Sequence, residues 1–141
     1  MIKSSVTIAL VPEAKGGPFV YWDDLPNSCS KAQELGFDGI EIFPRSSESV
    51  DKNQLQDLLS EHKLQFAAMG TGAGMVVHSL SLTNPDINIR KKATEFIKSI
   101  IDFAGPFGTP AIIGSMQGRH GGDTSKEQAI DWLSTGLKEL G

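Results

Sequence analysis

The chain has 141 residues, of which 39% are hydrophobic and 21% are charged, and its formal net charge is −4. This size suits one domain with its own core, and the composition excludes a disordered chain. The acidic balance, with scattered Lys and Arg, argues against a nucleic-acid surface, which needs clustered cations. Cys29 is the only cysteine, so no internal disulfide can form, and the first apolar run is far below the ~20 residues of a membrane span. We therefore predict a cytoplasmic protein that contacts neither nucleic acid nor membrane.

The first half of the chain alternates between strand and helix patterns. Residues 6–10 are apolar and β-branched and end before Pro12, which predicts a buried strand. Apolar residues at helical spacing then predict helices over 23–35 and 50–62. Between and after them, 37–43 and 65–69 read as strands.

The second half continues the same alternation. A glycine-rich loop at 70–74 lacks the further glycine of a dinucleotide fingerprint, and we expect loop or strand rather than helix over 75–82. A long helix is predicted after Asp86, to about Ala104, followed by a strand over 111–115. The last helix begins at Thr124–Ser125, where both residues match the capping-box spacing.

Four strand–helix units in succession predict the α/β class, with parallel strands joined by right-handed crossovers. Such units form either an open doubly wound sheet or half of a (β/α)8 barrel, whose full length is typically ~250 residues. Length alone favours the open sheet.

Polar residues near the strand ends are the candidate site residues, because parallel α/β proteins bind ligands at that edge. Glu41 lies in an apolar strand and must either face a polar cavity or form an ion pair, for instance with Arg45. Ser115 could hydrogen-bond a ligand or cap its loop. Arg119 is the one cation in a glycine-rich loop after a strand, which suits an anionic or hydroxylated substrate.

His78 and His120 follow the third and fourth predicted strands. A metal ion would need a third ligand, such as Glu41, and the spacing does not require one. A structural or solvent-exposed role is the more common one for each histidine.

Three segments together resemble the xylose-isomerase-like TIM-barrel superfamily of sugar phosphate isomerases and epimerases. They are Glu-Leu-Gly-Phe-Asp-Gly-Ile-Glu-Ile at 34–42, Leu-Thr-Asn-Pro-Asp-Ile-Asn-Ile-Arg at 82–90, and the stretch 104–119 with its Gly-Thr-Pro-Ala-Ile-Ile-Gly strand. The resemblance implies a single N-terminal half barrel over 1–141, made of four β-α units and lacking strands five to eight. It also implies carbohydrate metabolism.

In that family a divalent metal ion (Mn, Mg or Co) is held at the ends of the later strands, and two glutamates exchange protons beside the substrate carbonyl. The resemblance therefore implies a ketose isomerase or epimerase whose metal site lies in the C-terminal half, with no metal on this segment alone. This segment, inactive by itself, would supply the wall that lines a sugar or sugar phosphate, formed by Glu41, Thr71, His78, Ser115, Gln117 and Arg119. Its catalytic residues stay unassigned.

Two alternatives remain open. A half barrel exposes two strand edges and an apolar interior, which favours pairing with the missing C-terminal half or with a second copy as a non-catalytic scaffold or binding module. The apurinic endonucleases of the same superfamily bind zinc through histidines after strands three and four. That similarity keeps a zinc-dependent hydrolase, using His78, His120 and Glu41, as a minor alternative.

Overall fold

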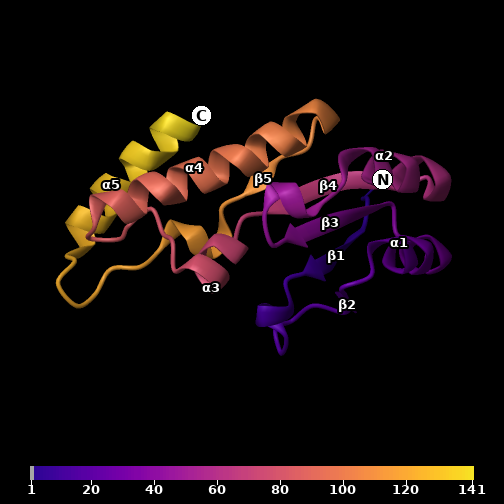
Figure 1. Ribbon diagram of the computed structural model, residues 1–141, viewed down its shortest axis with the longest axis horizontal. Coiled ribbons are helices and arrows are strands. Elements are labelled where there is room, and N and C mark those ends of the chain that lie inside the picture. The colour runs from indigo at the N-terminus through magenta and orange to yellow at the C-terminus, as the bar shows by residue number, and fades with distance from the viewer. Residues whose placement is uncertain (1) are drawn as a thin grey trace.

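The computed structural model describes residues 2–141, and its centre is one parallel sheet (Figure 1). The strand order is β2-β1-β3-β4-β5, so β2 and β5 are the two edges. The strands are β1 Ser5–Leu10, β2 Tyr21–Trp22, β3 Gly39–Pro44, β4 Gln65–Gly70 and β5 Ala111–Ile112. The predicted α/β class with parallel strands is confirmed.

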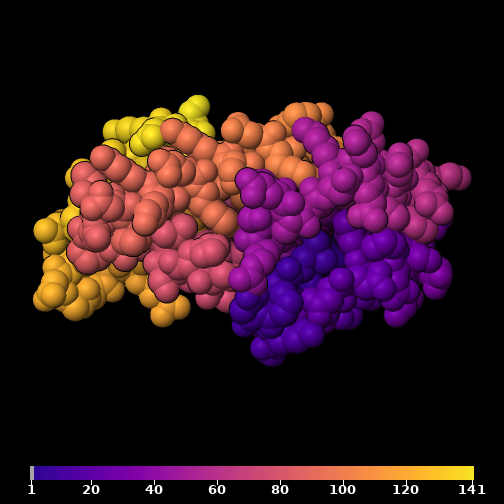
Figure 2. Space-filling model, viewed as in Figure 1, coloured from indigo at the N-terminus to yellow at the C-terminus, as the bar shows by residue number. Residues whose placement is uncertain are grey.

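Within residues 2–141, five α-helices accompany the sheet. They are α1 Leu25–Glu34, α2 Lys52–His62, α3 Ala73–His78, α4 Ile87–Ala104 and α5 Lys126–Leu140. Short 3-10 turns η1 Pro12–Ala14, η2 Ser47–Ser49, η3 Gly105–Phe107 and η4 Gly114–Gln117 lie in the connections. Figure 2 shows α1 and α2 (purple) at one end of an elongated molecule, and α5 (yellow) at the other. The sheet is open, because its edge strands β2 and β5 do not pair with each other.

Local capping explains where the long helices begin. Asp86 accepts a hydrogen bond from the Asn88 backbone N–H, so α4 starts at Ile87 as predicted. The Ser125 hydroxyl accepts from the Gln128 backbone N–H, and the Gln128 side-chain carbonyl accepts from the Ser125 backbone N–H. The predicted capping box that begins at Ser125 is therefore confirmed as the start of α5.

The main core lies between one face of the sheet and helices α1, α2 and α4. Ile8, Ile40, Ile42 and Met69 are fully buried there among helix residues. Cys29 belongs to this core, as predicted, and burial raises the pKa of its thiol to about 11. The helices therefore cover one face of the sheet, and we call the opposite face the inner face.

The structure differs from the expectations in three places. Of the residues expected to be loop or strand, 75–78 belong to helix α3, whose Gly74 packs so closely against Met116 that a Cβ atom would not fit, whereas 79–82 lie outside helices and strands as expected. The strand expected over 111–115 stops at Ile112, since Gly114 adopts a φ of +51° and starts the turn η4. The two-residue strand β2, which pairs with β1 at Ile8 and Ala9, was not expected.

Candidate functional site

The carboxyl ends of the strands meet at one edge, and the side chains on the inner face lead up to it. Alternation along β3 places Glu41 and Phe43 on this face, with Arg45 directly after the strand. Thr7 of β1 and Ala68 of β4 are the register partners of Glu41. The inner face therefore carries one carboxylate within a layer of small neighbours.

Glu41 is half-buried, and this burial raises the pKa of its carboxyl, while a hydrogen bond with the Thr7 hydroxyl lowers it by less. Among residues 2–141, no ion pair includes Glu41. The suggested pair with Arg45 is wrong, because Arg45 binds Glu13 instead. Glu41 thus lies on the inner face without an ion-pair partner among residues 2–141.

We expect Glu41→Gln to stabilise the fold at pH 7 and to leave it unchanged near about pH 4. Because the pKa of the Glu41 carboxyl is raised in the folded protein, this group costs no stability below its unfolded-state pKa. The protein loses stability as the pH rises through the folded-state pKa, where the half-buried carboxyl ionises. Glutamine does not ionise, so the variant avoids this loss. Urea denaturation of both proteins at the two pH values measures it, with Glu61→Gln, an exposed glutamate of α2, as the control. An equal gain at both pH values would contradict the assignment.

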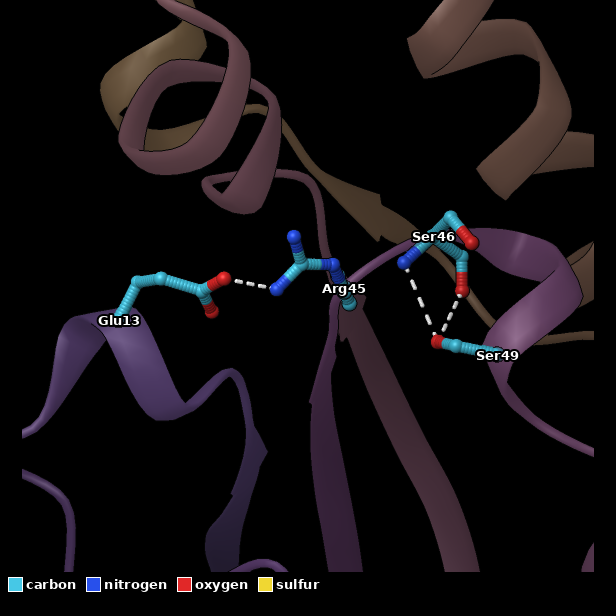
Figure 3. Close-up of polar contacts among 4 residues, drawn as sticks. All are labelled: Glu13, Arg45, Ser46 and Ser49. Carbon is cyan, nitrogen blue, oxygen red and sulfur yellow. Dashed lines mark hydrogen bonds and ion pairs between the residues drawn. The ribbon is translucent and has the colours of Figure 1, made fainter.

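Arg45 and Glu13 reach toward each other from two different connections (Figure 3). Glu13 lies in η1 after β1, and the hydrogen bond from Arg45 is the main cause that lowers the pKa of its carboxyl. The positive field of His78 contributes to the same lowering, so the end of α3 lies near this pair. Behind Arg45 the chain is fixed, since the Ser46 N–H donates to Ser49 Oγ (3.1 Å) and this hydroxyl donates to the Ser46 carbonyl (2.7 Å).

Three aromatic rings come from the same two segments of the chain as the Glu13–Arg45 pair, the one between β1 and α1 and the end of β3. Phe19 stacks on Phe43 with ring centres 5.2 Å apart, and Trp22 meets Phe19 edge-on at 5.6 Å. The Trp22 indole N–H donates to the Phe19 carbonyl at 3.1 Å, which ties Trp22 of β2 to the loop before it. Phe43 is buried, whereas Phe19 and Trp22 are partly exposed. We call Glu13, Phe19, Trp22, Glu41, Phe43 and Arg45 together the strand-end surface.

Thr71 and Ser115 lie at the next strand connection. Thr71 is fully buried, and its hydroxyl lies 3.0 Å from the Ile112 carbonyl and 2.8 Å from that of Ile113, so it joins β4 to β5. A ligand contact would require this hydroxyl to leave those carbonyls. Ser115 is exposed in η4, and its Oγ lies close to Gly72, which in turn packs against the Phe43 ring. Ser115 therefore borders the strand-end surface.

Gln117 and Arg119 lie in a different place from Glu41. Together with His120 they line a hollow of about 170 Å³ against α5, whose other walls are Thr83, Gly118, Lys126, Ala129, Ile130 and Leu133. Their part in a sugar-binding wall stays a prediction. The structure groups them with α5 rather than with the inner face.

His78, His120 and Glu41 do not come together. Across residues 2–141, no three side chains of His, Cys, Asp or Glu are placed to hold a metal ion. The chain's own residues therefore do not fit the metal that the family implies, and the zinc-hydrolase alternative lacks its ligand set here.

Sequence reasoning missed most of the strand-end surface. Glu13, Phe19 and Trp22 all come from the segment between β1 and α1, which contains η1 and β2 and in which sequence analysis identified no candidate residue. One available signal was position, because residues after a parallel strand face the ligand edge.

An open parallel sheet with polar and aromatic side chains at its carboxyl edge is typical of α/β proteins that bind small molecules. The profile of the family described as xylose isomerase-like TIM barrel matches residues 29–141. The chain belongs to this family. A comparison of the sequence with curated proteins finds no match.

Solved structures similar to this chain include three sugar epimerases. D-allulose 3-epimerase from Methylomonas sp. is 23% identical with a TM-score of 0.58, over 82% of this chain and 42% of that one. The 3-keto-D-glucoside 4-epimerase from E. coli is 12% identical with a TM-score of 0.66, over 99% and 51% of the two chains. D-psicose 3-epimerase from Clostridium cellulolyticum H10 is 17% identical with a TM-score of 0.63, over 97% and 47%.

These similarities show the fold, and the chain spans about half the length of the structures that it matches. The predicted half of a TIM barrel is thereby confirmed. The helices formed by residues 2–141 include none that is both long and apolar enough to cross a bilayer.

Proposed function

We propose that this chain is the N-terminal half barrel of a sugar isomerase or epimerase that acts on ketoses by metal-assisted proton transfer beside the carbonyl. The family match over residues 29–141 carries the proposal, and the epimerase neighbours support it. The divalent metal ion, Mn, Mg or Co, would be held by the C-terminal half, since residues 2–141 supply no ligand set.

Within this scheme the strand-end surface would bind the sugar and orient it. Carboxylate and guanidinium groups offer acceptors and donors for hydroxyl groups, and the aromatic rings offer apolar surface. The proton-transferring groups would come from the other half. This chain alone would therefore bind a sugar without turning it over.

A non-catalytic dimer of half barrels is the second candidate. The open edges β2 and β5 favour it, because unpaired strand edges call for a partner.

The intact mass, the mass in solution and the metal content of the natural protein distinguish the two candidates. The enzyme proposal predicts a polypeptide about twice as long as these 141 residues that carries a divalent metal ion. A polypeptide of 141 residues that forms a metal-free dimer would overturn it in favour of the scaffold.

A further inference from the structure

We propose that the strand-end surface selects a neutral sugar over a sugar phosphate, with the Glu13–Arg45 pair binding two neighbouring hydroxyl groups. This inference rests on the proposed function and names the substrate class of that site. It is argued from the charges, the donors and acceptors, and the aromatic rings.

The arginine and the lysine near the carboxyl edge of β1 and β3 are already neutralised, and His78 at the end of α3 is the remaining basic side chain near the Glu13–Arg45 pair. Arg45 is paired with Glu13, and Lys15 of the same loop is paired with Asp23 at 2.8 Å. A phosphate group carries about −1.5 to −2 charges at neutral pH and is bound by unpaired Arg or Lys. An incoming phosphate would instead meet two carboxylates beside those cations, which disfavours it.

A neutral sugar fits the same pair well. Neighbouring hydroxyls both donate and accept, so one can donate to the Glu13 carboxylate while the other accepts from the Arg45 guanidinium. Arg45 uses Nη1 for Glu13, which leaves the other N–H groups of its five-donor fork for a ligand. Both side chains are accessible, with 46% of Arg45 and 40% of Glu13 exposed.

The aromatic rings complete the match. Phe19, in the loop that follows Glu13, stacks on the buried Phe43, and Trp22 of β2 meets Phe19 edge-on; Phe19 and Trp22 are both partly exposed. The C–H face of a sugar ring is apolar and packs on aromatic rings, while its hydroxyls bind polar groups. Opposite charges and aromatic rings carried by the same two segments of the chain suit a polyol better than an anion.

Other cations are grouped elsewhere. Arg119, His120 and Lys126 line the hollow against α5, and none of them forms an ion pair within residues 2–141. A phosphate-binding site would be expected at that hollow, so the test must distinguish the two locations.

Amide NMR spectra of the 141-residue chain, titrated with D-fructose, D-allulose, D-tagatose or D-fructose 6-phosphate, test the inference. We expect a neutral ketose to shift the amides of Glu13, Phe43 and Arg45, and the phosphate to bind there no more tightly. Glu13→Gln frees the Arg45 guanidinium from its ion pair. It should therefore weaken binding of the neutral ketose and strengthen binding of the phosphate, changing the ratio of the two affinities by about tenfold. Arg45→Met should weaken the binding of both ligands.

The control is Glu139→Gln, which breaks the exposed Lys98–Glu139 pair far along the chain and should leave the ratio unchanged. If the phosphate binds the strand-end surface about tenfold more tightly than every neutral ketose in the unmodified chain, the inference is wrong and the proposed function stands. Phosphate that shifts only the α5 hollow, while neutral ketoses shift the strand-end surface, supports the inference. Shifts from none of these sugars at the strand-end surface would overturn the sugar site itself, and the proposed function with it.

Discussion

Ile42→Ala is expected to lower the free energy of unfolding by about 3–4 kcal/mol. Ile42 is fully buried on the helix-facing side of β3, next to Ile8 of β1 and Met69 of β4. Because β3 is the middle strand, neighbours on both sides hold the backbone in place, and the cavity left by the missing side chain cannot close. Urea denaturation followed by circular dichroism measures the change.

Leu35→Ala is the matched control for this change. Leu35 lies at the end of α1 with 71% of its surface exposed, so we expect a change within about 0.5 kcal/mol. Similar losses for the two variants would mean that the sheet and helices do not pack as described.

Gly118→Ala should cost about 3 kcal/mol, for two reasons that add. The backbone of Gly118 has φ +81° and ψ −162°, a conformation that is essentially restricted to glycine. A Cβ atom there would also collide with the Thr83 hydroxyl and lie only 3.0 Å from the Ser81 side chain. Thr83 would then lose its 3.2 Å hydrogen bond to the Arg119 carbonyl.

A second glycine offers a sharp control. Gly105 has φ −51° and ψ −49°, and no atom lies within 4 Å of where its Cβ would be. Gly105→Ala is therefore expected to raise the free energy of unfolding by about 0.5 kcal/mol, because alanine restricts the unfolded chain. Calorimetric melting of both variants should give shifts of opposite sign. Two shifts of the same sign would contradict the loop geometry at Gly118.

The parts of the fold that could be predicted are those determined by residues close together in the sequence. The starts of α4 and α5 follow from Asp86 and from Ser125 with Gln128, whose hydrogen bonds span two or three residues. The strand β3 follows from its apolar run. Helix α3 could not be predicted, because its Gly74 packs against Met116, some forty positions later.

The site was predicted only in part, for a similar reason. Glu41 stands out as a charge within an apolar strand, and the structure places it on the inner face. The Glu13–Arg45 pair joins residues separated by 32 positions, and nothing in either local pattern specifies the other. Gln117 and Arg119 follow the correct strand, but the positive φ of Gly118 turns their loop toward α5.

Deuterium exchange at the carbon next to the ketose carbonyl is the most direct test of the proposed function. The natural protein, loaded with manganese, would be incubated with neutral ketoses in deuterium oxide and followed by proton NMR. The proposed function predicts that this proton signal disappears, that a chelator stops the exchange, and that the 141-residue chain alone produces none. Absence of exchange for every ketose tested, in a metal-loaded protein that still binds sugar at the strand-end surface, would contradict it.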